Sequence, residues 1–97
     1  MTGRSFTRHV VMFSAKKVED IPRIVEGLSM LADIPHSEVF EVVENGKLDT
    51  LSSEADVVVY AEFRDRDALL RYKAHPLYQE AIDVVRPLRA MRVAADF

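Results

Sequence analysis

Four side chains of this 97-residue sequence could move a proton or hold a polar ligand: His9, Tyr72, Tyr78 and Asp96. An imidazole that lies beside a carboxylate is oriented by it and can act as a general base near neutral pH. A tyrosine hydroxyl can donate a hydrogen bond to a carbonyl oxygen or serve as an acid. Together these groups suit acid–base chemistry without a cofactor. The alternative is that His9 and Asp96 only fix the register of two strands, and that the tyrosines are ordinary core aromatics with satisfied hydroxyls.

The two tyrosines flank a break in a helical pattern. Apolar residues follow helical spacing up to Tyr72 and again from Tyr78, but His75-Pro76 lies between them. The residue before a proline is disfavoured in the α conformation, and proline is tolerated in a first helical turn. The sequence therefore predicts two consecutive helices, with His75 at the cap and Pro76 as the first residue of the second. On one unbroken helix the two rings would point about 240° apart, so the break lets them face a common space.

The rest of the pattern predicts the order βαββαβ in one domain over residues 1–97. Runs of β-branched and aromatic residues predict strands at 9–13, 39–44 and 57–63, and a shorter, β-compatible tail predicts the last at 91–97. Apolar residues three and four apart predict a helix from Ile21 to Ile34, with Asp20 as its N-cap and Pro35 ending it, and residues 48–55 should form a loop. This order is that of a ferredoxin-like α+β fold, a four-stranded antiparallel sheet with both helical regions on one face.

The first and third strands, which are central in this topology, are apolar on both faces. Two helical regions can cover only one face, so we expect a homodimer in which two sheets pack face to face and enclose an interior, a dimeric α/β barrel. Alternatively, the C-terminal segment could fold across the second face. On the last strand the more apolar side is expected to face the helices, which would leave Arg92 and Asp96 beside His9 on the interior side. That apolar side consists of Met91, Val93, Ala95 and Phe97.

A small, partly apolar ligand is expected in this interior. The residues expected to line its site, besides the four chemical candidates, are Val11, Phe13, Val59, Ala61, Arg92 and His75. The histidines form no closely spaced pair, and no zinc, calcium, nucleotide or serine-hydrolase motif is present. We therefore expect no cofactor.

Composition narrows the partners further. Lysine and arginine number 13 against 16 aspartates and glutamates, a net charge of −3 that argues against nucleic acid as a partner. The chain has no cysteine, which fits a reducing cytoplasm. No apolar run approaches the roughly 20 residues needed to span a bilayer, so no membrane association is expected.

Three stretches resemble the stress-responsive A/B barrel domain (Dabb) family of the dimeric α+β barrel superfamily: HVVMF, DVVVYAEFRDRDALLRYKAHPLYQE and VRPLR with VAADF. The resemblance covers nearly the whole chain. It is most specific in the Y-x-x-H-P-x-H-like segment, in the histidine of the first strand and in the aspartate followed by an aromatic residue at the C-terminus. It implies a ferredoxin-like fold and a tight homodimer.

The resemblance implies two classes of function. Some members are stress proteins, and a cyclase-type member closes a linear polyketide by aldol condensation, using the tyrosine and the histidine at the two ends of that segment. Here the tyrosine matches Tyr72, but Tyr78 replaces the histidine, so His9 would have to supply a base from the opposite wall. A cation on backbone carbonyls in some members would correspond to Leu31, Ile34 and Ser37. The alternatives are thus a ligand-binding barrel with cyclase-, isomerase- or lyase-like chemistry, and a non-catalytic dimer with a filled core.

Overall fold

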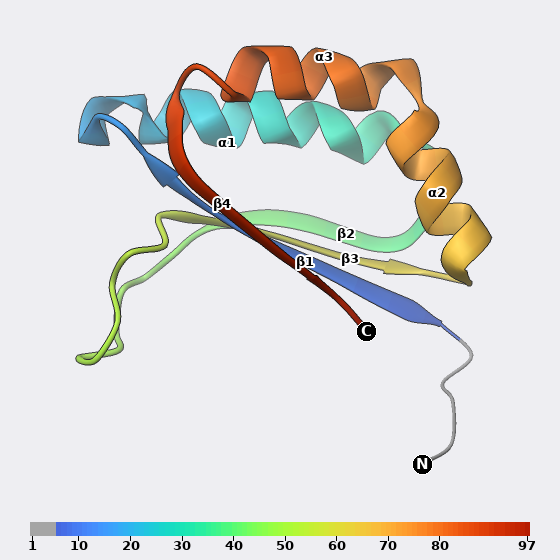
Figure 1. The fold of residues 1–97 in the computed structure, drawn as a ribbon, viewed down its shortest axis with the longest axis horizontal. Coiled ribbons are helices and arrows are strands. Elements are labelled where there is room, and N and C mark those ends of the chain that lie inside the picture. The colour runs from blue at the N-terminus through green and yellow to red at the C-terminus, as the bar shows by residue number, and fades with distance from the viewer. Residues whose placement is uncertain (1–5) are drawn as a thin grey trace.

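One face of a four-stranded antiparallel sheet is covered by helices, and the other face is open (Figure 1). The computed structural model describes residues 6–97. The strands lie in the order β2-β3-β1-β4, so β1 and β3 are central. This confirms the ferredoxin-like βαββαβ fold. The elements in chain order are β1 (Thr7–Ala15), a 3-10 turn η1 (Val18–Asp20), α1 (Ile21–Ser29), a 3-10 turn η2 (Met30–Asp33), β2 (Ser37–Glu44), β3 (Val57–Phe63), α2 (Arg66–Ala74), α3 (Pro76–Val85) and β4 (Arg89–Asp96).

The first helical region ends where proline predicts and begins at the predicted residue, but without a side-chain cap. Ile34, which precedes Pro35, has extended backbone angles and ends η2. At the other end, α1 begins at Ile21 with Asp20 at the N-cap position, as predicted, but Asp20 does not cap the helix with its side chain. Its backbone is already helical because η1 precedes α1, and its side chain accepts no cap hydrogen bond. Its carboxylate instead accepts a hydrogen bond from Arg23 at 3.4 Å.

The core lies between the sheet and the helices. In β3 every second side chain faces the helices and is buried, and β1 contributes Val11 and Phe13 to the same layer. Phe63 and Ile24 are fully buried there, and burial of a side chain of this size contributes about 1.5–3 kcal/mol. Burial therefore alternates along β3, and its fully buried side chains mark the face of the sheet that the helices cover.

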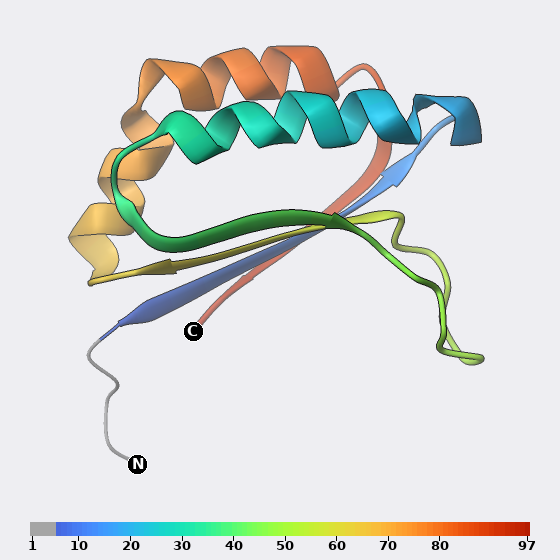
Figure 2. The same cartoon turned by 180° about the vertical axis from the view of Figure 1, so that it is seen from behind.

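The open face carries an apolar row across all four strands. Val43 is paired with Val58, Val58 with Met12, and Met12 with Val93. In Figures 1 and 2 the helices lie on one side of the sheet, and β4 runs along the sheet's edge instead of crossing the open face. Among residues 6–97 no element covers this face, and Val93 remains 55% exposed.

The predicted orientation of β4 is wrong. Asp96 is paired with His9, and Arg92 with Phe13, so Arg92 and Asp96 share the helix-facing side of the sheet with those β1 residues. The apolar side of β4 therefore faces away from the helices. The physical reason is that β4 is an edge strand, whose helix-facing side is incompletely covered and can hold charged groups, while its apolar side continues the open face.

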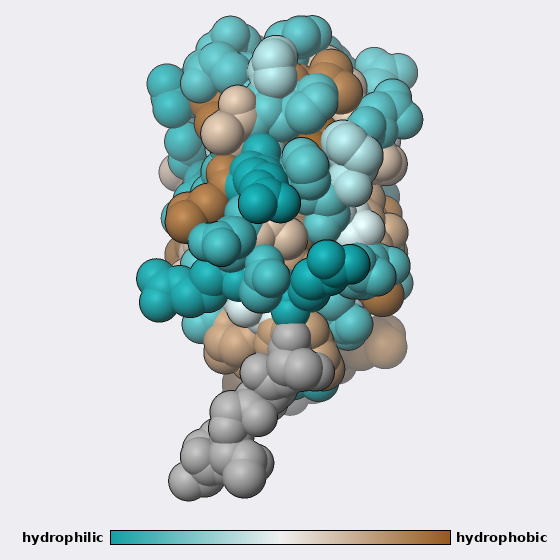
Figure 3. Space-filling model, turned by 90° about the vertical axis from the view of Figure 1, so that its right-hand side faces the viewer, coloured by the Kyte–Doolittle hydropathy of each residue, from teal (hydrophilic) through white to brown (hydrophobic). Residues whose placement is uncertain are grey.

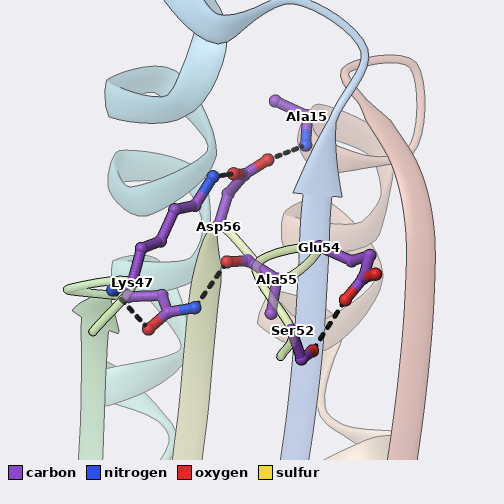
Figure 4. Close-up of polar contacts among 7 residues, drawn as sticks. Ala15, Lys47, Ser52, Glu54, Ala55 and Asp56 are labelled. Carbon is purple, nitrogen blue, oxygen red and sulfur yellow. Dashed lines mark hydrogen bonds and ion pairs between the residues drawn. The ribbon is translucent and has the colours of Figure 1, made fainter. Parts of the chain in front are cut away.

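The connection between β2 and β3 projects to the side of the sheet away from the helices (Figures 1 and 2). It contains no helix or strand, as the sequence predicts, and Leu51 in it is 93% exposed. Its base is tied down by Asp56, whose carboxylate accepts hydrogen bonds from the backbone N–H of Ala15 at 2.8 Å and from Lys47 Nζ at 2.5 Å (Figure 4). Asn45 adds a hydrogen bond from Nδ2 to the carbonyl of Ala55 at 2.7 Å.

The end of the molecule formed by α2 is mostly hydrophilic (Figure 3). There α2 exposes charged side chains such as Arg66, Asp67 and Arg71, with Leu70 as an isolated apolar group. Within residues 6–97 none of the helices has the length and apolar character that crossing a membrane requires.

Candidate functional site

A cavity of about 290 Å³ lies between the sheet and the helices, under α3 and beside the edge strand β4. The ligand site was expected between the two sheets of a dimer, and that position is wrong for this cavity. His9 and its neighbours on β1 face the helices of their own chain. Most of the wall is apolar and belongs to the core. Its apolar lining includes Val11, Phe13, Leu28, Leu31, Val59 and Val85.

Two tyrosines meet in the cavity because of the helix break. His75 has an extended backbone, ends α2 and caps α3, and its Nδ1 accepts a hydrogen bond from the backbone N–H of Leu77 at 3.1 Å. Pro76 is the first residue of α3, where its missing N–H is harmless. With α2 and α3 free to take different directions, the rings of Tyr72 and Tyr78 meet edge to face, with centroids 5.4 Å apart.

His9 forms the opposite wall and is held by Asp96. Its Nδ1 donates a hydrogen bond of 2.5 Å to Asp96 Oδ1, across the β1–β4 pair that the topology predicts. Within residues 6–97 no side-chain nitrogen or oxygen that is sealed from solvent lacks a hydrogen-bond partner. The Nε2 atom has no hydrogen-bond partner among residues 6–97, and His9 lines the cavity.

Burial of His9 lowers the pKa of its imidazole, and the carboxylate of Asp96 opposes this effect. The 2.5 Å contact alone would favour the imidazolium. Burial prevails because the Asp96 side chain is 42% exposed and its charge is screened by solvent, whereas the His9 side chain is only 1% exposed. The positive charges of Lys73 and Arg92 lower the pKa further. His9 is therefore neutral near pH 7 and can accept a proton at Nε2.

The hydroxyl groups of both tyrosines belong to residues that line the cavity. Burial raises the pKa of Tyr72, and the neighbouring Tyr78 adds to the increase. The Tyr72 hydroxyl has no hydrogen-bond partner within residues 6–97. The Tyr78 oxygen accepts a hydrogen bond from Arg92 Nη2 at 3.4 Å, which leaves its own proton free to be donated.

Two further arginines, Arg86 and Arg89, line the cavity, and the sequence did not indicate either of them as a site residue. Arg86 follows the last residue of α3, and Arg89 begins β4. The run of three arginines between residues 86 and 92 was the available signal, but nothing in the sequence showed that they share one side.

Not every residue expected at the site reaches the cavity. Val11, Phe13, Val59 and Arg92 line it, whereas Ala61 is buried in the core and His75 serves as a helix cap. Asp96 does not line the cavity and contacts His9 from behind.

The cation site on the backbone carbonyls of Leu31, Ile34 and Ser37 stays a prediction. The Leu31 carbonyl accepts a hydrogen bond from Ile34 N–H at 3.1 Å, and Ser37 belongs to β2. No group of three histidine, aspartate or glutamate side chains suited to a metal ion occurs between residues 6 and 97.

Sequence comparison gives a family match over nearly the whole chain. The profile described as the Stress responsive A/B Barrel Domain, Dabb, matches residues 7–97. No protein with a curated description is significantly similar.

Solved structures share the fold over their full length. A dimeric ferredoxin-like protein of unknown function from Thermobifida fusca is 25% identical, with a TM-score of 0.79 over 95% of this chain and 89% of the other. A Dabb family protein with a ferredoxin-like fold from Mesorhizobium loti is 22% identical, with a TM-score of 0.79 over 97% and 96%. A mutant of SnoaB, a cofactor-independent oxygenase from Streptomyces nogalater, is 16% identical, with a TM-score of 0.71 over 97% and 92%. At these identities the last two comparisons show the fold alone.

Proposed function

The chain belongs to the stress-responsive A/B barrel domain (Dabb) family, and we propose that it binds a small, partly apolar carbonyl compound in its cavity and moves a proton on it. The observation that carries this proposal is the meeting of a neutral, carboxylate-held imidazole and two tyrosine hydroxyls at one apolar cavity. Such convergence of a few polar groups in a mostly apolar cavity of about 300 Å³ is typical of small-molecule sites. The cavity favours ligand binding over the alternative of a filled core.

The geometry supports enolisation. Nε2 of His9 would accept a proton from a carbon next to the carbonyl group, and the electrons of that C–H bond would form an enolate. Tyr72 and Tyr78 would donate hydrogen bonds to the enolate oxygen, where the negative charge develops. The imidazolium is stabilised by Asp96. In an isomerisation, the imidazolium of His9 would return the proton to another carbon of the enolate. In an aldol ring closure, the enolate would first attack a second carbonyl group, and the imidazolium would give the proton to the alkoxide that forms there.

The test begins with a thermal-shift screen of enolisable aromatic ketones and linear polyketides. Compounds that bind are then incubated in D2O, and deuterium incorporation next to the carbonyl is followed by NMR. His9→Gln should keep binding but slow exchange by about a hundredfold or more, and His36→Gln, outside the cavity, is the matched control. Tyr72→Phe should weaken binding or exchange, with Tyr60→Phe on the open face as its control. Exchange that is equally fast in His9→Gln and wild type would refute the assignment of the base.

The open sheet face supports assembly as a homodimer. Its apolar row, formed by Val43, Val58, Met12 and Val93, has no covering element within residues 6–97. The T. fusca relative is described as dimeric. Two copies placed with these faces in contact would remove both rows from water, and burial of apolar area is the main driving force for such association.

Sedimentation at micromolar concentration tests the dimer. Wild type should sediment as a dimer, and Val93→Glu should shift it toward monomer because a charge would be buried in the interface. Leu70→Glu on α2, where the leucine is 59% exposed, should leave the dimer intact. A monomeric wild type would refute the assembly.

A further inference from the structure

The mouth of the cavity is lined by three arginines, Arg86, Arg89 and Arg92. Arg86 and Arg92 are exposed and Arg89 is half-buried, whereas the floor of the cavity is apolar and buried. Positive charge is thus concentrated at the entrance. The chain as a whole is acidic, with a net charge of −3, so this concentration is not a consequence of a general excess of basic residues.

The three guanidinium groups lack anionic partners within the described part of the chain, residues 6–97. None of them forms an ion pair with a carboxylate of residues 6–97, whereas Lys47 is paired with Asp56 and Arg23 with Asp20. Between residues 6 and 97 the only side-chain hydrogen bond from these three arginines goes from Arg92 to the Tyr78 hydroxyl. Guanidinium groups that are not used inside the chain can bind a planar or tetrahedral anion with paired hydrogen bonds.

A β-bulge aims two of the arginines at the same space. In a regular strand residues three apart point to opposite faces, which would send Arg89 and Arg92 to different sides. Here Met91 is paired with Ser14 but Arg89 with Ala15, so Ala90 is the extra residue and the register shifts. Arg92 opposite Phe13 and Arg89 opposite Ala15 therefore both lie on the helix-facing side. Bulges commonly re-aim a side chain next to a functional site.

From this geometry we propose that Arg86, Arg89 and Arg92 form an anion subsite, which selects ligands with an apolar body and a terminal carboxylate or phosphate group. The apolar body would occupy the cavity near Val59 and Phe13, and the anionic end would lie at the mouth. This inference rests on the proposed ligand binding in the cavity. It narrows the substrate class to acidic carbonyl compounds or their phosphorylated counterparts.

Three probes of one shape test the proposal: 2-naphthoate, 2-naphthyl phosphate and the uncharged 2-naphthamide. Affinity is measured by titration calorimetry at 20 and 300 mM NaCl. At least one anionic probe should bind about tenfold or more tightly than the amide, since hydrogen bonds between a guanidinium group and an anion are stronger than those to a neutral group. That preference should shrink at high salt. Whether carboxylate or phosphate binds better identifies the anion.

Variants locate the subsite. Arg89→Gln and Arg86→Gln should remove most of the preference for the anion without weakening the amide, and Arg89→Lys should keep part of it. Arg66→Gln, on α2 and away from the cavity, is the matched control. Circular dichroism confirms that each variant is folded. Equal binding of anionic and amide probes would overturn the anion subsite but leave the proposed cavity function intact, whereas no binding of any probe would overturn both.

Discussion

Replacing Gly27 with alanine should destabilise the protein, although alanine is the better helix former. Gly27 is buried where α1 packs on α3, and an added Cβ would lie 2.9 Å from Val84 Cγ1 and 3.0 Å from Val85 Cγ2. Val84 is 43% exposed and can turn away. Val85 is only 2% exposed and is part of the core, so α3 itself would have to move.

Two opposing effects set the magnitude. Alanine gains about 1 kcal/mol over glycine within a helix, whereas overpacking a well-packed contact costs about 1–3 kcal/mol. The expected net loss in the free energy of unfolding is about 1 kcal/mol, which for a domain of this size lowers Tm by roughly 4–8 °C.

Urea denaturation at a fixed protein concentration measures this difference, because association would make stability concentration-dependent. The same replacement made in a Val85→Ala background should cost much less, since Cγ2 of Val85 is then absent and only the exposed Val84 side chain has to shift. Gly27→Ala with unchanged or raised stability in the wild-type background would refute the close contact. So would an equal loss in both backgrounds, measured as a double-mutant cycle.

Three further predictions concern single groups. Burial lowers the pKa of His9 from 6.5, so below about pH 6.5 the unfolded chain binds more protons than the folded chain. The free energy of unfolding should therefore fall as the pH drops below about 6.5, at a slope of at most about 1.4 kcal/mol per pH unit. His9→Gln should flatten that part of a curve of Tm against pH, and an unchanged curve would contradict the lowered pKa of His9. Asp56→Ala should lower the free energy of unfolding by about 1–3 kcal/mol, because a buried acceptor for Ala15 N–H and the partner of Lys47 are lost. If Asp49→Ala in the exposed loop lowers it equally, these two contacts of Asp56 do not stabilise the fold. His75→Ala should cost about 1 kcal/mol and His75→Asn less, because asparagine is a good N-cap; equal thermal shifts for the two variants would remove the cap from the explanation.

Sequence reasoning succeeded where one local rule determines the structure. Proline and its preceding residue set the break at His75-Pro76 and the end of η2 at Ile34. The run of β-branched and aromatic residues predicted the strand from Val57 to Phe63, and the antiparallel neighbours of the fold brought His9 to Asp96.

It failed where a position depends on tertiary context. The apolar side of β4 was expected toward the helices, but the strand lies at an edge and that side continues the open face. Arg89 was missed because an extra residue, Ala90, interrupts the two-residue period of the strand, and a bulge leaves no local signal here. Asp20 takes the predicted N-cap position but its side chain accepts no cap hydrogen bond, because the preceding turn η1, which has no apolar periodicity of its own, already gives Asp20 a helical backbone.

His75 ends α2 and caps α3, so the two tyrosines of the cavity lie on separate helices and differ in how well the fold tolerates their substitution. Tyr72 is 1% exposed and packs on Phe63 with ring centroids 4.9 Å apart, so substitution there disturbs the core. Tyr78 is only half-buried and belongs to the next helix, whose direction is set by Pro76 and not by the ring. A mutation at position 78 can therefore change a polar group that lines the cavity while the fold and the Tyr72 hydroxyl stay in place. If the proposed function holds, proteins of this architecture could diverge in chemistry through this position with little loss of stability.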